Sequence, residues 1–275
     1  MKIPTETYFH LGLPKVASTY FQNIIFPKLT GIRFYPKHQF NSYKEITKGE
    51  KGGKFLFSTE KDKRLVETVE EILGYAPDAK VILFVRRQED WIISRYKYHI
   101  RKHGGYSFKE FFDIDSDNGI WRREELFWRE KIERIEQLCQ SPPLVLKFDD
   151  LKKNPDIFIK KITDYTGTTL NAKSGMKKKV LKAFNEKQLI VLRKFNRLFN
   201  YKPIKTKNPT LNKTHRKYRE FLLHILSLIS HLVPGFMIAE KSLFTEADRK
   251  DFKRIQEHYK EDWEFCQSYS ESRSD

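Results

Sequence analysis

Short apolar runs alternate with longer stretches of helical periodicity over roughly the first 167 residues of the chain. The clearest run is Lys80–Val85, which is almost continuously apolar, as is typical of a parallel strand buried on both faces. Because strands and helices alternate four times, this region is predicted to form an α/β fold with a parallel sheet. The predicted strands cover residues 7–11, 54–58, 80–85 and 143–148, and the predicted helices cover 18–28, 59–73, 90–102, 121–140 and 154–167.

Beyond residue 167 the pattern is helical, with helices predicted over 184–199, 213–232 and 245–268. The poorly periodic residues 30–53 are expected to form an irregular connection that, together with residues 104–120, shapes a substrate cleft. We expect one domain over residues 1–275, with an α/β core over about 1–167 and a helical C-terminal part over about 168–275.

The first predicted strand runs into a short turn that carries Lys15, and Ser18 and Thr19 then open a helix. The first N–H groups of a helix lack acceptors within the helix, and the helix dipole adds partial positive charge at the same end. A lysine and two hydroxyls complete a set of donors for an anion. The stretch is therefore predicted to bind a phosphate group.

This loop differs from the Walker A loop, which reads G-x-x-x-x-G-K-[ST]. Gly12 is present, but the second glycine is absent, Ser18 stands where the lysine would be, and the lysine lies three places earlier, at Lys15. The strand over residues 80–85 ends in Arg86 and Arg87 rather than in a carboxylate that could hold Mg²⁺. The pattern disfavours an ATPase and suits a reaction without a metal. A nucleotide kinase or another P-loop phosphotransferase is the alternative.

The run Pro14-Lys15-Val16-Ala17-Ser18-Thr19 resembles the 5′-phosphosulfate-binding loop of sulfotransferases that use 3′-phosphoadenosine-5′-phosphosulfate (PAPS). A second motif of that family is an arginine that ends a strand, followed eight residues later by a serine; Arg86 and Ser94 match it. Two positions depart from the pattern: Ala17 replaces the commoner glycine, and Gln88 stands where many members have proline. The resemblance covers about residues 6–100 and is to the bacterial, carbohydrate-type branch.

The resemblance implies a P-loop-NTPase-like central sheet flanked by helices, PAPS as co-substrate and no metal. It implies that Lys15 stabilises the leaving phosphate, and that Val16, Ala17, Ser18 and Thr19 hold the phosphosulfate with it. Arg86 and Ser94 are implied to bind the 3′-phosphate, which a guanidinium fork suits. Members often close a late basic loop over the nucleotide, and Lys202, Lys205 and Lys207 are candidates for it or for an exposed loop.

Transfer to a hydroxyl needs a general base within reach of its proton. Glu60 follows the strand over residues 54–58 in a Ser-Thr-Glu turn that resembles the carbohydrate branch, whose base is often a glutamate. The alternative role for Glu60 is to complement the dipole of a helix capped by Thr59. His38 and His103 are rival bases. His10 lies inside the first strand, and we expect it to be packed or to support the site indirectly.

The chain carries 53 lysine and arginine residues against 36 acidic ones, a formal net charge of +17. Such a charge favours an anionic partner or reflects a lysine-rich surface. The expected acceptor is a hydroxyl-bearing glycan or glycolipid, by resemblance to the carbohydrate branch. No nucleic-acid motif is present, so nucleic acid is not expected as a partner; a non-catalytic polyanion-binding protein is a further alternative.

The most apolar predicted helix lies over residues 221–238 and is interrupted by Pro234 and Gly235. Core packing is one interpretation, and contact with a membrane surface is the other. No run reaches the roughly 18 apolar residues of a membrane span, and the N-terminus lacks the apolar segment of a signal peptide. With only Cys139 and Cys266, a cytoplasmic location is expected. The acceptor's identity and the oligomeric state stay open.

Overall fold

The computed structural model describes residues 5–49, 52–61, 63–102, 104–171, 184–199, 206, 208–232 and 242–272. Its contacts divide the chain into two compact units. The first comprises Met1–Trp91, Glu124–Lys178 and His258–Asp275, and the second comprises Ile92–Arg123 and Lys179–Glu257. The organisation as one domain over residues 1–275 stays a prediction.

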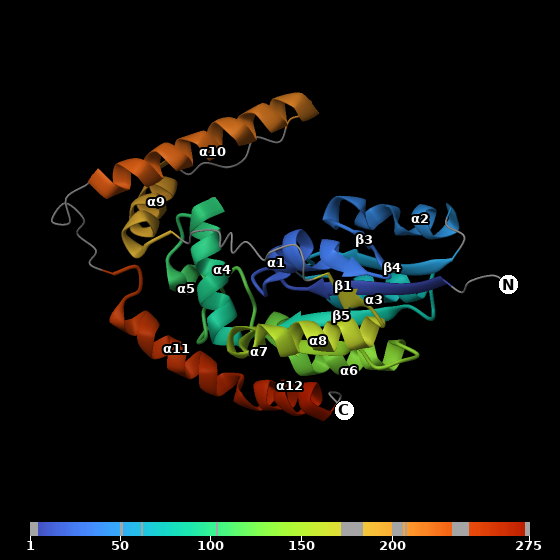
Figure 1. The fold of residues 1–275 in the computed structure, drawn as a ribbon. Coiled ribbons are helices and arrows are strands. Elements are labelled where there is room, and N and C mark those ends of the chain that lie inside the picture. Colours follow the sequence, from blue (N-terminus) through green and yellow to red (C-terminus); the bar gives the residue numbers. More distant parts are fainter. Residues whose placement is uncertain are drawn as a thin grey trace. The chain divides into compact units, whose positions relative to one another are not determined.

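The first unit contains a five-stranded sheet in the order β3-β4-β1-β5-β6, with every neighbouring pair parallel. This confirms the predicted α/β fold with a central parallel sheet (Figure 1). The strands are β1 (Thr5–Gly12), β3 (Arg33–Tyr35), β4 (Gly53–Ser58), β5 (Lys80–Val85) and β6 (Leu144–Lys147). A small antiparallel pair joins β2 (Leu29–Thr30) to β7 (Thr169–Leu170).

Successive side chains of the central strand β1 point to opposite faces of the sheet. Phe9 packs against Phe40 and Tyr43, whereas His10 packs against Phe26 and Phe84. The Phe9 face is covered by η3 (Lys37–Ser42), α2 (Tyr43–Gly49) and α3 (Leu65–Leu73), and α6 (Trp128–Leu138) packs against α3. The His10 face is covered by α1 (Ser18–Tyr20), η1 (Phe21–Ile25), η2 (Phe26–Lys28) and α8 (Pro155–Thr166).

Three further elements belong to the first unit. They are η4 (Glu124–Leu126), α7 (Phe148–Lys153) and α12 (Lys260–Ser272). Two of them, α7 and α12, pack against β6. The last of these also packs against α6, so the C-terminal helix contributes to the α/β unit.

The second unit takes most of α4 (Gln88–Lys102), which begins in the first unit, and adds α5 (Phe108–Phe111), α9 (Glu186–Phe199), α10 (Pro209–Leu232) and α11 (Glu246–His258). Tyr96 lies at its centre: the hydroxyl donates to the Tyr106 carbonyl at 2.9 Å and accepts from Arg193 at 2.9 Å. The Tyr96 ring packs against Phe108 and Phe244, so aromatic contacts hold this unit's core.

Three predicted elements differ from the structure because tertiary contacts override the local pattern. The segment expected to be irregular over 30–53 contains β3, η3 and α2. The edge strand β3 has only three residues, too few to show the alternation of polar and apolar positions that identifies a strand. Residues 121–127 are outside α6, whose first amides, Trp128 and Arg129, donate to the Asp262 carboxylate on α12 at 3.0 and 2.8 Å. The predicted helix over 245–268 is two helices, separated at Tyr259, whose buried ring packs against Phe127.

The helix predicted to start at Thr59 starts at Leu65 instead. The amide of Thr59 donates to the His10 carbonyl at 3.0 Å, and the amide of Lys61 donates to the Gly12 carbonyl at 3.1 Å. The backbone after β4 thus continues alongside β1 instead of turning into a helix, and Thr59 is not the N-cap of α3. Glu60 therefore does not lie in the first turn of a helix.

Candidate active site

The loop between β1 and α1 contains two non-glycine residues in the left-handed region of backbone space. Lys15 has φ of 75° and Ala17 has φ of 71°. This conformation costs an L-residue about 1–2 kcal/mol, so other contacts must stabilise the loop. Val16 between them is fully buried, and a side chain at Gly12 would put its Cβ 3.0 Å from the Phe84 carbonyl oxygen. The start of the loop is thus packed directly against β5.

Residues of the β5–α4 connection hold this loop from the neighbouring strand. The Trp91 indole donates to the Pro14 carbonyl at 2.7 Å, and the Arg86 guanidinium donates to the Lys15 carbonyl at 3.1 Å. Arg86 in turn lies 4.6 Å from the Phe148 ring centroid, and its carbonyl accepts from the Trp128 indole at 3.0 Å. The two sequence motifs, about seventy residues apart, are therefore in contact.

Two buried donors beside this loop have no hydrogen-bond partner among the described residues: Ser18 Oγ and Arg86 Nε. Burial lowers the pKa of Arg86, and the nearby carboxylates of Asp90 and Asp149 oppose that shift. A buried donor without an acceptor is costly, and it is satisfied when an anion binds. The donor set around the loop therefore fits a phosphate or sulfate group. Thr19, by contrast, is exposed.

Glu60 lies beside the start of the loop, because the amides on either side of it pair with β1. Its side chain is 17% exposed, and Lys37 Nζ lies 3.5 Å from its carboxylate oxygen. The sequence pattern missed Lys37, which is twenty-three positions away from Glu60 on η3. The ion pair orients the Glu60 carboxylate. A carboxylate in this position is a candidate to accept the proton of a bound hydroxyl.

A buried polar network lies behind Glu60. His10 Nδ1 is 2.7 Å from Ser58 Oγ, and the Gln22 side-chain amide donates to the same hydroxyl at 2.9 Å. His10 is fully buried, which lowers its pKa to about 3 and keeps the ring neutral. The network joins β1, β4 and η1, so it links the strand that carries the loop to the strand that carries Glu60. His10 is therefore packed between the strands, which is one of the two roles expected for it.

The other predicted residues fall into three groups. Ser94 lies about two turns along α4, in the second unit, and its pairing with Arg86 stays a prediction. His38 is exposed on η3. His103, Lys202, Lys205 and Lys207 lie outside the described residues.

Comparisons with known proteins bear on this site. A profile described as the sulfotransferase family matches residues 9–172. A solved sulfotransferase from Alicyclobacillus acidocaldarius is similar at 14% identity and a TM-score of 0.50, over 62% of this chain and 83% of that one. The mouse sulfotransferase SULT7A1, solved with PAP, aligns at 14% identity and a TM-score of 0.47, over 98% of this chain and 91% of that one. No curated protein matches the chain. At this identity the structural likeness concerns the fold alone.

The left-handed backbone at Ala17 leads to a stability prediction. Ala17→Gly removes the steric cost of the Cβ atom, which outweighs the entropy that glycine adds to the unfolded chain, so the free energy of unfolding should rise by about 0.5–1 kcal/mol. Urea denaturation measures the change. Ala76→Gly is the control: Ala76 is not among the described residues with positive φ, so this change should give no gain. A lower free energy of unfolding in Ala17→Gly would contradict the claim that the backbone at Ala17 is strained.

The buried neutral His10 leads to a pH prediction. Its pKa is about 3 in the folded state and 6.5 in the unfolded state, so the unfolded chain binds the extra proton between these values. Stability from this group is complete above pH 6.5 and falls as the pH drops toward 3, by about 2 kcal/mol between pH 7 and 5. His10→Asn keeps an acceptor for Ser58 and should flatten the decline by that amount in denaturation at each pH. The exposed His38→Asn should leave it unchanged, and equal slopes in all three proteins would refute the assignment.

Proposed function

Because the chain belongs to the sulfotransferase family, we propose that it transfers a sulfuryl group from PAPS to a hydroxyl of a glycan or glycolipid acceptor. One observation supports the donor above others: beside the loop bound by Arg86, the buried Ser18 hydroxyl and Arg86 Nε have no hydrogen-bond partner in the described part of the chain. In this proposal Ser18, with Lys15 in the same loop, suits the phosphosulfate end of the nucleotide, and Arg86 suits its 3′-phosphate. Membership of the family supports sulfuryl transfer as the reaction. PAPS as the donor and a glycan or glycolipid as the acceptor are what we propose.

In the proposed reaction, the acceptor oxygen attacks sulfur in line with the bond to the leaving phosphate. The new S–O bond forms as the bridging S–O bond breaks, and the electron pair of the broken bond stays on the phosphate oxygen. Lys15 stabilises that growing negative charge, which is larger in the transition state than in the ground state. Val16, Ala17, Ser18 and Thr19 hold the phosphosulfate, and Arg86 with Ser94 binds the 3′-phosphate.

Glu60 accepts the proton of the acceptor hydroxyl in this proposal. Its position beside the loop start supports the role, since the amides of Thr59 and Lys61 hold it against β1. The start of α3 at Leu65 removes the competing explanation that Glu60 complements a helix dipole. Lys37 Nζ, 3.5 Å from the carboxylate oxygen, forms an ion pair with Glu60 and orients its side chain.

The proposed roles predict distinct kinetic effects. Lys15→Ala should lower kcat by about 10²–10³-fold because the charge on the leaving oxygen loses its cation. Glu60→Gln should lower kcat by about 10²–10⁴-fold with little change in nucleotide affinity, because only proton removal is lost. Labelled PAPS measures turnover on a panel of glycan acceptors, and melting with adenosine 3′,5′-bisphosphate measures nucleotide binding. The matched control is Glu67→Gln, an exposed carboxylate on α3.

Each result separates the proposal from its rivals. Full turnover by Glu60→Gln would assign the base elsewhere, with His38 tested next. Stabilisation by Mg²⁺ and ATP, but not by the bisphosphate, would favour a P-loop phosphotransferase. Binding to heparin that falls steeply with salt, without nucleotide binding, would favour a polyanion-binding protein.

We further propose that α10 contacts a membrane surface, which would suit a glycolipid acceptor. Large apolar side chains along this helix are 46–60% exposed, namely Leu211, Tyr218, Phe221, Leu228 and Ile229. At about 100° per residue they fall within one exposed arc of the helix. Exposed Lys213 and Lys217 lie on the same helix and favour anionic lipid. No helix in the described ranges is both long and apolar enough to cross a bilayer.

This contact predicts lipid-selective binding. The protein should sediment with vesicles that contain phosphatidylglycerol and much less with pure phosphatidylcholine, and salt should weaken the binding. Replacing Phe221 and Leu228 with serine should weaken binding at least about tenfold, because two exposed apolar side chains are lost. Ile157→Ser on α8, which is 53% exposed, is the control and should bind as the wild type does. Equal binding by all variants would rule out α10 as the contact.

A further inference from the structure

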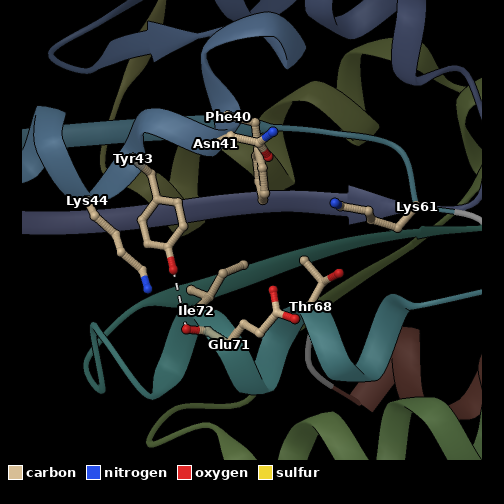
Figure 2. A pocket seen from close by; sticks show the side chains of 8 residues that line it. All are labelled: Phe40, Asn41, Tyr43, Lys44, Lys61, Thr68, Glu71 and Ile72. Atoms are coloured by element: carbon tan, nitrogen blue, oxygen red, sulfur yellow. Dashed lines mark hydrogen bonds between the residues drawn. The ribbon is translucent and has the colours of Figure 1, made fainter. Parts of the chain in front are cut away.

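A pocket of about 460 Å³ opens on the Phe9 face of the first unit, between α2 and α3. Figure 2 shows its lining side chains: Phe40 and Tyr43 stand over one side, Thr68 and Glu71 rise from α3 on the other, and Lys61 reaches in from the segment after β4. The volume lies within the range of pockets that bind small ligands. None of the roles assigned above uses this pocket.

The pocket carries an excess of positive charge. Lys61 Nζ lies 5.5 Å from the Phe40 ring centroid, and Lys44 Nζ lies 5.7 Å from that of Tyr43. The acid of the lining, Glu71, accepts from Arg64 at 2.8 Å, so its charge is already balanced. Two ammonium groups beside the aromatic rings of Phe40 and Tyr43 favour a ligand that is itself anionic.

The two aromatic side chains beside these lysines, Phe40 and Tyr43, form one wall of the pocket, and Tyr43 is held in place. The Tyr43 hydroxyl donates to the Glu71 carbonyl at 3.3 Å, which fastens α2 to α3, and its ring packs edge-on against Phe9 at 5.3 Å. Asn41 adds an exposed amide at the rim. Aromatic carbon, one amide and two cations together suit a sugar ring that bears an acidic group, since such a ring has C–H surfaces, hydroxyls and a negative charge.

The pocket is joined to the candidate base by two short segments. The helix η3 begins at Lys37, which pairs with Glu60, and its last residues line the pocket. At about 2 Å per residue in a 3₁₀ helix, Lys37 and Asn41 lie about 8 Å apart along it. Lys61 directly follows Glu60 and lines the pocket from the other side. A linear acceptor with its hydroxyl at Glu60 therefore reaches the pocket with a neighbouring sugar.

We infer that this pocket binds an acidic sugar of the acceptor, next to the sugar that is sulfated. Lys44 and Lys61 bind its carboxylate or sulfate ester, and the aromatic wall packs against the ring. The inference rests on the proposed function and narrows its acceptor to acidic glycans. It also assigns Lys44 and Lys61 as specificity-determining residues.

Calorimetry with matched probes tests the inference. The probes are a tetrasaccharide that contains glucuronate, its carboxyl-reduced counterpart, and a sulfated form of that counterpart. The wild type should bind the two acidic probes at least about tenfold more tightly than the neutral one, because only the acidic probes form charge-assisted hydrogen bonds with the lysines. Lys44→Gln with Lys61→Gln should abolish that preference. Lys44→Arg with Lys61→Arg should keep it.

The control variant is Lys48→Gln. Lys48 lies 5.9 Å from the Tyr75 ring, beside the pocket but outside its lining, so this change should leave the preference intact. Equal binding of acidic and neutral probes by the wild type would overturn the inference, as would an unchanged preference in the glutamine double variant. The double variant should still be stabilised by adenosine 3′,5′-bisphosphate. If the wild type does not bind the bisphosphate, the proposed donor fails, whatever the sugar measurements give.

Discussion

The hydrogen bond from Arg86 to the Lys15 carbonyl is the contact on which the rest of the site depends. The loop adopts left-handed backbone at Lys15 and Ala17 without glycine at either position, a conformation that is unfavourable by itself. Trp91 donates to the Pro14 carbonyl and Arg86 donates to the Lys15 carbonyl. These two residues, which follow the neighbouring strand β5, stabilise the unfavourable backbone conformation of the loop. The same arginine, with Nε left over, is then available to an anion.

Arg86 is itself held in place by the residues around it. Arg86 is buried against Phe148, and its backbone is held by Trp128, so the guanidinium has little freedom. A preorganised donor loses little conformational entropy when its ligand binds. The hydrogen bond between the neutral His10 on β1 and Ser58 on β4 joins the strand before the Lys15 loop to the strand before Glu60. The proposed base and the proposed leaving-group cation thus follow two neighbouring strands, β4 and β1, which pair in parallel.

Much of the site could be predicted from the sequence, because its pieces are local. The buried run Lys80–Val85 and the strand–turn–helix around Lys15 identify their own structure, and Arg86 follows a strand end that the hydropathy pattern locates. The partners of these residues could not be predicted. Lys37 beside Glu60 and Asp262 at the start of α6 are contacts between distant segments, and no local pattern encodes them. The same reason explains why residues 121–127 and the helix expected at Thr59 were predicted wrongly.

The sequence by itself determined the parallel α/β architecture, the anion loop with its lysine, and the arginine at the end of the next strand, since each depends on periodicity or on residues adjacent in the chain. The tertiary structure decided which of those groups act together. It bonded the amides around Glu60 to β1 and brought Lys44 and Lys61 to the lining of one pocket. It also buried Ser18 Oγ and Arg86 Nε without a hydrogen-bond partner among the described residues. These features depend on burial and on contacts across the sheet, and both arise only when distant strands and helices pack together.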